Sequence, residues 1–329
     1  MAATNSHGKT SLDLSGIYPP ILTPFTLSPE EAVKQPAFQD EFPRLAELFD
    51  HWNSVDFAGY VVLGSNGEFP YLSWQEKKHL LHKVSSIVRS QAAANRQRKL
   101  IIVGVGCEGT LDTLRLCSHL EVASHADALL VLTPSFYGQS STEAALYAHF
   151  TRVADEAPLP VILYNVPANT GVDMSADLIC RLSRHPNVVG IKDSGGDLKK
   201  LRSVVERTKG TGFQVLAGSA GFLLDALDIG CVGGVCATAN CFGDELVEIQ
   251  REFQANGRSE KARRLSDRIK GPNLLATRML GVPALKHITA WRYRLKPFHL
   301  REPLQPLTSE QTAEVMVSLE KSGFEPIQR

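Results

Sequence analysis

The feature that most limits how this chain can fold is a regular alternation of short apolar runs and segments with helical spacing. The apolar runs cover residues 16–25, 59–64, 100–105, 128–133, 160–165, 188–192, 213–217 and 233–237. The helical patterns between them cover residues 41–53, 73–90, 110–124, 142–156, 175–184, 197–208 and 219–229. Strands that alternate with helices form βαβ units and a parallel sheet. Eight such units over about 230 residues predict an α/β fold, a closed (β/α)8 TIM barrel.

The two ends of the chain differ from this central part. Residues 243–329 contain no further strand pattern and predict three or four helices, with breaks at Gly257, Gly271-Pro272 and Pro283. We therefore expect a disordered tail over 1–15, a barrel over 16–242 and a helical appendage over 243–329 packed on the barrel. The first sixteen residues are polar and arginine-free, which favours a cytoplasmic protein over a secreted one and leaves a mitochondrial location open.

Composition excludes several classes of partner. The chain has 35 Lys+Arg and 35 Asp+Glu, so its formal charge of zero gives no reason to expect nucleic acid or an anionic membrane as a partner. No window of about 18 uncharged apolar residues predicts a membrane span. The six cysteines form no CxxC pair, which indicates buried free thiols in a reducing compartment.

One lysine stands where a charged side chain is costly. The β-branched run from Val188 to Ile191 predicts a buried strand that ends in Lys192, and Asp193 begins the turn that follows. Burial of a lysine favours its neutral amine, which can attack a ketone and form a Schiff base. The alternative is a lysine whose stem lies along the barrel wall while its ammonium reaches water.

Other polar side chains end neighbouring strands of the predicted barrel. Ser65 and Asn66 follow the second strand, Thr133 ends the fourth, and Tyr164 lies at the end of the fifth. The carboxyl ends of the strands form the active-site face of a TIM barrel. Together with Lys192 they would place an amine, hydroxyls and an amide around one mouth, a set that can form a Schiff base and relay protons to and from it.

Four motifs resemble a known superfamily. GSNGE (64–68), YNVPANTG (164–171), GIKDSGGD (190–197) and VLAGSAGF (215–222) are similar to motifs of the dihydrodipicolinate synthase / N-acetylneuraminate lyase superfamily. The resemblance runs from about residue 16 to the end, and it is strongest to the 4-hydroxy-2-oxoglutarate aldolases. It implies a class I, Schiff-base aldolase that handles pyruvate on a (β/α)8 barrel without a cofactor, and a homotetramer built as a dimer of dimers.

The resemblance also implies roles for individual residues. Lys192 would be the Schiff-base lysine, and Tyr164 would carry the proton during carbon–carbon cleavage. Ser65 would pass protons to Tyr164 and, with Asn66, hold the pyruvate carboxylate. The residues that would contact the distal part of the substrate or line the pocket are Ser194, Gly218 and Val235.

Two positions depart from the synthase pattern. Dihydrodipicolinate synthases have an arginine in YNVPxRTG, where this chain has Asn169, so condensation with aspartate semialdehyde is disfavoured. The tyrosine that a neighbouring subunit lends to the proton relay would fall at Phe136. The adjacent Tyr137 could take its place after a small shift, or the relay could lack this member.

The resemblance therefore implies a lyase that cleaves a 4-hydroxy-2-oxo acid, in the first place 4-hydroxy-2-oxoglutarate, to pyruvate and an aldehyde such as glyoxylate. The enzyme alternatives are a dihydrodipicolinate synthase and a 2-keto-3-deoxy sugar acid aldolase. The alternative of another class is a catalytically silent barrel that binds a keto acid.

Two further patterns predict no site. His79 and His82 lie three residues apart, but no carboxylate near them in the sequence completes a metal site, so a solvated helix face is expected. Lys286-His287 forms a small polar cluster that we expect at the surface or at a subunit contact.

Overall fold

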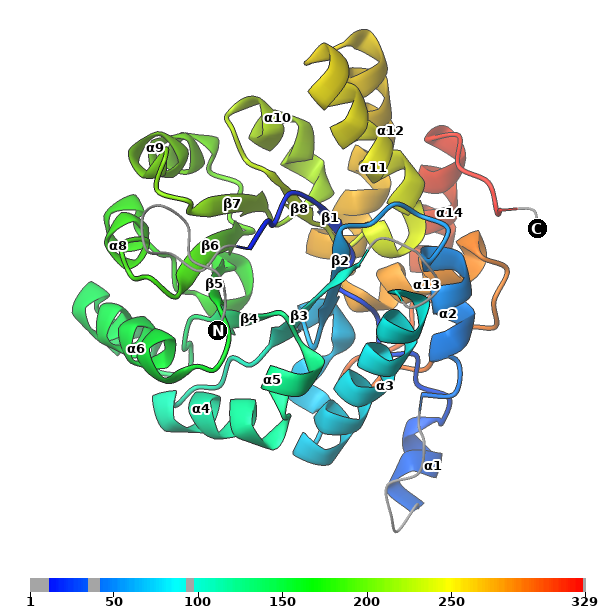
Figure 1. Cartoon of the computed structure of the whole chain (residues 1–329). Coiled ribbons are helices and arrows are strands. Elements are labelled where there is room, and N and C mark those ends of the chain that lie inside the picture. Colours follow the sequence, from blue (N-terminus) through cyan, green and yellow to red (C-terminus); the bar gives the residue numbers. More distant parts are fainter. Residues whose placement is uncertain (1–11, 35–41, 93–97, 328–329) are drawn as a thin grey trace.

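Eight parallel strands form the centre of the molecule. The structure is a computed structural model and describes residues 12–34, 42–92 and 98–327 (Figure 1). Its single sheet has the strand order β1-β8-β7-β6-β5-β4-β3-β2. The strands are β1 (Gly16–Tyr18), β2 (Gly59–Val62), β3 (Leu100–Gly104), β4 (Ala128–Leu132), β5 (Val161–Asn165), β6 (Val188–Asp193), β7 (Gln214–Ala217) and β8 (Gly233–Val235). The predicted TIM barrel is confirmed.

The barrel closes between its first and second strands. Pro20 forms a parallel bridge with Val61, and the Ile21 amide donates to the Val61 carbonyl at 2.9 Å. The first strand is shorter than the predicted run of 16–25, because Pro19 and Pro20 have no N–H to continue a ladder.

Helices surround the barrel. In the barrel part of the chain they are α1 (Pro29–Lys34), α2 (Leu45–Trp52), α3 (Trp74–Ala92), α4 (Thr110–His119), α5 (Val122–His125), α6 (Glu143–Glu156), α7 (Pro167–Thr170), α8 (Ala176–Leu182), α9 (Leu198–Thr208) and α10 (Leu223–Asp228). The predicted helix 110–124 was wrong as a single element. It divides at Glu121, whose φ of 52° is left-handed and cannot continue a right-handed helix.

The apolar side chains form a barrel interior and a layer between the strands and the helices. The interior cluster includes Tyr18, Val61, Tyr164 and Val235. Leu14 also belongs to it, and its amide donates to Oε1 of Gln214 at 2.8 Å. The predicted disordered tail was therefore wrong for residues 12–15, because Leu14 is buried in the barrel; residues 1–11 lie outside the described part of the chain.

The C-terminal region is helical, as expected, and packs on one side of the barrel beside α2 (Figure 1). Its helices are α11 (Ala239–Asn256), α12 (Glu260–Leu274), α13 (Val282–Arg292) and α14 (Ser309–Lys321), with a π-helical turn η5 (Leu275–Met279) after α12. The predicted break at Gly271-Pro272 was wrong, because α12 continues through Pro272. α11 crosses the proposed boundary at residue 242, with a kink at Phe242, so the division into barrel and appendage stays a prediction.

Within the described ranges, the chain contains no helix whose length and hydropathy would suit a membrane span. The cysteines form no disulfide; five are buried and Cys107 is partly exposed.

Candidate active site

Lys192 and Tyr164 lie side by side at the carboxyl ends of β6 and β5. The parallel register of these strands places Tyr164 directly opposite Lys192. Nζ of Lys192 lies 4.0 Å from the centroid of the Tyr164 ring, and the lysine is only 2% exposed. The alternative in which the Lys192 ammonium reaches bulk water is therefore wrong. The amine lies against the phenol of Tyr164 inside the barrel. The strand continues one residue beyond the prediction, because Asp193 still pairs with β5 and β7.

Ser65 completes a group of three with this pair. Its Oγ lies 3.3 Å from Oη of Tyr164. Ser65 opens a short 3-10 turn, η1 (Ser65–Gly67), and the left-handed φ angles of Leu63 and Glu68 turn the chain sharply on both sides of it. Asn66 follows Ser65 in the same turn.

The phenol of Tyr164 is tuned by its neighbours. Burial by itself raises the pKa of Tyr164, but the charge of Lys192 and hydrogen bonds with Ser65, Lys192 and Ser194 outweigh burial and lower the pKa below its usual value. A phenol with a lowered pKa accepts and returns a proton more readily near neutral pH. The arrangement is therefore suited to proton transfer next to an amine.

Ser194 and Gly218 border the same group. The Ser194 hydroxyl donates to the Gly218 carbonyl at 3.3 Å, and the Gly218 amide donates to the Asp193 carbonyl at 2.7 Å. A Cβ at position 218 would lie 2.6 Å from the backbone carbonyl oxygen of Asp193 and 2.1 Å from Oγ of Ser194, so only glycine fits there. Val235 ends β8 and belongs to the same interior cluster as Tyr164.

A polar network beneath Lys192 was missed by sequence reasoning. The fully buried carboxylate of Asp193 accepts hydrogen bonds from Asn165 Nδ2 at 2.7 Å and from the Gly195 amide at 2.8 Å. Lys200 lies 3.3 Å from the same carboxylate. This network fixes the ends of β5 and β6 and the start of the next loop. The only signal in the sequence was an acidic residue directly after the candidate lysine.

A second buried pair supports the Ser65 turn. Glu68 and Lys286 form an ion pair in which the side chains are 1% and 2% exposed, and the Arg301 amide donates to Glu68 at 2.9 Å. The expectation that Lys286 lies at the surface or at a subunit contact was therefore wrong: α13 directs it into the core, against the carboxylate of Glu68. No local pattern joins these two residues, so the sequence could not have paired them.

Phe136 and Tyr137 lie outside this group within the chain. Their side chains are 78% and 76% exposed, in the loop after β4. The carboxylate of Glu108 holds this loop by accepting from the amides of Ser135 at 2.7 Å and Phe136 at 2.8 Å. Tyr137 is thus not brought together with Lys192 by the fold of one chain.

Arg278 is a further cation near the mouth that sequence reasoning missed. It lies in η5, and a Cβ at Gly196 would be 3.5 Å from its Nη2, so its guanidinium reaches the loop after β6. Asn273 fixes the preceding helix to the loop after β7 by donating to Oγ of Ser219 at 3.1 Å. The exposed guanidinium of Arg278 has no hydrogen bond or ion pair to any residue that the structure describes.

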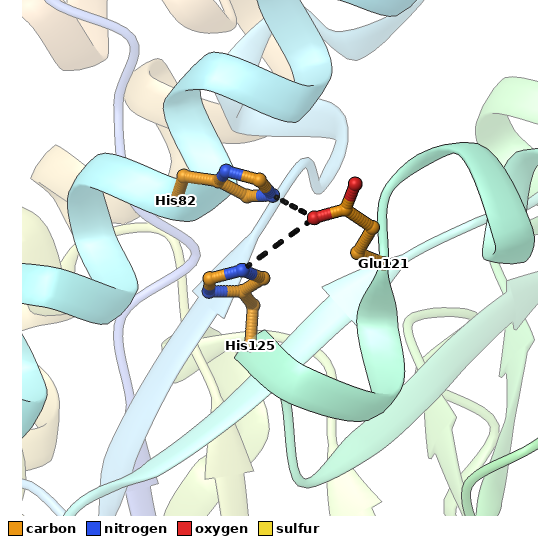
Figure 2. Close-up of side chains that lie close together, drawn as sticks. All are labelled: His82, Glu121 and His125. Atoms are coloured by element: carbon orange, nitrogen blue, oxygen red, sulfur yellow. Dashed lines mark ion pairs between the residues drawn. The ribbon is translucent and has the colours of Figure 1, made fainter.

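Away from the mouth, the interpretation of His79 and His82 needs correction. His79 stacks on Phe42, with ring centroids 6.0 Å apart. His82 instead lies beside Glu121 and His125, so a carboxylate does complete a set of three possible ligands (Figure 2). Sequence reasoning missed it because the second histidine and the carboxylate come from another part of the chain.

An amine, a phenol and a hydroxyl converge at the strand ends of a (β/α)8 barrel, which is the arrangement expected in an enzyme of the Schiff-base lyase class. Comparison with known proteins agrees. The model of the dihydrodipicolinate synthetase family matches residues 13–322. The chain therefore belongs to this family and is an enzyme of its class of pyruvate-dependent class I aldolases and lyases.

Similar proteins differ in the substrates that their names give. The chain is 34% identical over 267 residues to a probable mitochondrial 4-hydroxy-2-oxoglutarate aldolase from Emericella nidulans, covering 80% of this chain and 84% of the relative. It is 34% identical over 253 residues to an L-threo-3-deoxy-hexylosonate aldolase from Hypocrea jecorina, covering 74% and 76%. A 4-hydroxy-tetrahydrodipicolinate synthase from Methanoculleus marisnigri is 30% identical over 240 residues, covering 73% and 76%.

Solved structures show the same architecture. A dihydrodipicolinate synthase from Bacillus anthracis has a TM-score of 0.82 at 28% identity, covering 97% of this chain and all of that one. The enzyme from Acinetobacter baumannii, solved with pyruvate, has a TM-score of 0.81 at 26% identity, covering 95% of this chain and 100% of that one.

Proposed function

We propose that this enzyme cleaves 4-hydroxy-2-oxoglutarate to pyruvate and glyoxylate through a Schiff base on Lys192. The observation that carries the proposal is the buried contact of Lys192 with Tyr164, whose hydroxyl lies 3.3 Å from Ser65. A protein that only bound a keto acid would not need an amine at this place.

The chemistry assigned to these residues has three steps. Nζ of Lys192 attacks the C2 ketone and water leaves, which gives an iminium. The Tyr164 phenolate takes the proton of the C4 hydroxyl, the C3–C4 bond breaks, and its electrons move to the iminium nitrogen, so that glyoxylate leaves and an enamine remains. Tyr164 then returns a proton to C3, and water hydrolyses the new iminium to free pyruvate and the amine.

Ser65 and Asn66 are assigned to the C1 carboxylate of the substrate. They lie in a turn beside Tyr164, and a short helical turn presents backbone N–H groups that suit a carboxylate. Ser65 has a second role in this proposal, since its contact with Oη lets it pass protons to and from Tyr164. Ser194, Gly218 and Val235 are assigned to the remainder of the pocket.

Arg278 supports a substrate with a second carboxylate. The synthase-type arginine is absent, and Asn169 in its place is exposed. The guanidinium of Arg278 reaches the loop that follows Lys192 and has no described partner, so it is available to a distal carboxylate. Because 4-hydroxy-2-oxoglutarate carries such a group and a deoxy sugar acid carries hydroxyls there, Arg278 favours the dicarboxylate.

A deoxy sugar acid aldolase is the second candidate. It is favoured by the relative from Hypocrea jecorina, which is as similar in identity as the relative named for 4-hydroxy-2-oxoglutarate. Both reactions use the same Schiff base and differ only in the aldehyde that leaves. Dihydrodipicolinate synthase activity is less favoured because of Asn169.

The proton relay is proposed to gain a member from a neighbouring subunit in a homotetramer. Tyr137 is exposed on the loop after β4, where a second copy of the chain can contact it. Phe136 has no hydroxyl, so the relay lacks this member if Tyr137 does not take the place. Light scattering of the purified protein would give the number of subunits. A Tyr137→Phe variant that assembles normally but turns over more slowly would support the relay role.

The first experiment is borohydride trapping with pyruvate, followed by intact mass and peptide mapping. We expect one reduced pyruvate adduct on the peptide that contains Lys192. A substrate panel would then compare 4-hydroxy-2-oxoglutarate, 2-keto-3-deoxy sugar acids, and pyruvate with aspartate semialdehyde. Binding of pyruvate without an adduct or turnover would refute the proposal in favour of a silent binding barrel.

A cytoplasmic location is proposed, with a mitochondrial one as the alternative. The relative from Emericella nidulans is named as a mitochondrial enzyme. Imaging of the full-length chain with a C-terminal fluorescent tag would distinguish the two compartments.

A further inference from the structure

A cluster of three side chains on the outer helical layer has no part in the proposed reaction. His82 comes from α3, Glu121 connects α4 and α5, and His125 ends α5. Figure 2 shows both imidazole rings directed at the same carboxylate oxygen. Nε2 of His82 lies 3.4 Å from Oε2 of Glu121, and Nε2 of His125 lies 3.9 Å from it.

We propose that His82, Glu121 and His125 bind a divalent transition-metal ion of the Zn2+ type. Two imidazole nitrogens and one carboxylate oxygen are a ligand set that suits Zn2+, Co2+ or Ni2+. Water would complete the coordination, since the side chains are 31%, 50% and 27% exposed in the order of the chain.

The separations of the ligand atoms fit such an ion. Tetrahedral bonds of about 2.0–2.1 Å place neighbouring ligand atoms about 3.3–3.4 Å apart. The distance from His82 to Glu121 already has this value, and that from His125 to Glu121 is half an ångström longer. The rings are stacked 3.8 Å apart with a tilt of 26°, so a rotation about the χ2 torsions would turn both nitrogens to one ion.

The orientation of His82 also favours a metal ligand. One ring nitrogen bonds the backbone carbonyl of Leu120, while Nε2 is buried without a hydrogen bond. Metal-binding histidines commonly donate their second nitrogen to a carbonyl in this way, which directs the free lone pair at the ion.

Lys78 opposes the ion and sets a limit on its affinity. It lies one helical turn before His82 on α3 and forms an ion pair with Oε1 of Glu121. The metal would bind the other oxygen of Glu121, Oε2. The positive charge of the Lys78 ammonium on Oε1 would then repel the metal ion from a short distance. Removal of this charge should therefore strengthen binding, a direction that a purely structural ion pair would not give.

The position of the site indicates a structural role. α5 leads directly into the amino end of β4, so the cluster lies toward the opposite end of the barrel from Lys192. A bound ion would join α3 to the connection between α4 and α5, where Glu121 interrupts the helix. Because it would bind only the folded chain, it should raise the melting temperature.

The test begins with full-length protein stripped by a chelator and dialysed. Titration with CoCl2 and ZnCl2, followed by equilibrium dialysis, should give one ion per chain and a rise in Tm of several degrees. The Co2+ spectrum should show ligand-field bands without the intense sulfur-to-cobalt band of a cysteine site. Absence of saturable binding, or that sulfur band, would overturn the proposal.

Variants then assign the ligands. His82→Gln and His125→Gln should each weaken Zn2+ binding by more than about tenfold, whereas His79→Gln, on the same helix but stacked on Phe42, should bind as the wild type does. Lys78→Met should bind about threefold more tightly or better. Circular dichroism of the metal-free variants checks the fold. Equal affinity of the His82 and His125 variants and the wild type would refute the site.

Discussion

Glu68 and Lys286 join the end of the barrel that carries the candidate site to the C-terminal helices through a fully buried ion pair. Glu68 follows the turn that holds Ser65 and Asn66, and Lys286 comes from α13 and also donates to the His299 carbonyl at 2.6 Å. The C-terminal region is thus part of the support of the candidate site. If it were lost, a charged carboxylate would be left in the core.

Glu68→Gln should strongly destabilise the protein. It leaves the Lys286 charge buried without its partner, which costs about 3–5 kcal/mol in comparable pairs. Urea unfolding measures the loss, and the double variant Glu68→Gln/Lys286→Met should recover part of it. Asp112→Asn, at the exposed pair with Arg115, is the matched control and should change stability by less than about 1 kcal/mol. Similar losses for Glu68→Gln and this control would contradict the role of the pair.

Lys192→Arg and Lys192→Met should abolish both the pyruvate adduct and turnover. Neither side chain offers a nucleophilic amine, and Met at this buried place removes a desolvated charge, so the melting temperature should not fall. Mass spectrometry after borohydride treatment measures the adduct. Lys199→Met, on the exposed face of α9, should keep wild-type labelling. Residual wild-type-like activity in either Lys192 variant would refute the mechanism.

Tyr164→Phe should separate Schiff-base formation from cleavage. Loss of the phenol removes the group assigned to the C4 proton, and general acid–base catalysis contributes about 10²–10⁴-fold in rate. We expect turnover to fall by that range while pyruvate is still trapped on Lys192. Ser65→Ala removes the contact with Tyr164 at 3.3 Å and the hydroxyl assigned to the C1 carboxylate, and it should cost at least about tenfold. Undiminished cleavage by Tyr164→Phe would exclude Tyr164 as the base.

Arg278→Gln should raise KM for 4-hydroxy-2-oxoglutarate by about 10–100-fold. This is the loss of affinity expected when a hydrogen bond to a charged group is removed. Pyruvate trapping and the cleavage of a neutral 4-hydroxy-2-oxo acid should not change, because neither has the distal carboxylate. Arg278→Lys should recover part of the loss. An equal effect on the charged and neutral substrates would show that Arg278 acts on the fold of the mouth and not on the carboxylate.

The free energy of unfolding should fall in mild acid because the buried His149 resists protonation in the folded chain. Burial lowers the pKa of His149 from 6.5 to about 4, and its Nδ1 lies 2.8 Å from Thr110 Oγ1. Between these pH values the unfolded chain binds a proton that the folded chain does not, so stability falls as pH decreases from about 6.5 to about 4. The loss approaches about 3 kcal/mol. Urea unfolding of His149→Gln across this range should show a shallower pH dependence; an unchanged slope would contradict it.

The sequence by itself determined the barrel and the central chemistry. Strand and helix patterns have different periods, so eight alternations could be read locally. Lys192, Tyr164 and Ser65 could be named as candidates because the active residues of a TIM barrel follow its strands. The strand ends that carry them meet at one mouth whatever the details of packing. That is why these three residues could be grouped before any coordinates were known.

Only the tertiary structure decided which distant residues meet. Leu14 enters the barrel interior, Lys286 turns inward to Glu68, and His82 meets His125 rather than solvent beside His79. Whether a polar side chain is paired or solvated depends on the elements packed against it, which spacing along one helix does not record. The sequence therefore specified the groups that can react, and the packing of helices from separate parts of the chain decided what holds them in place.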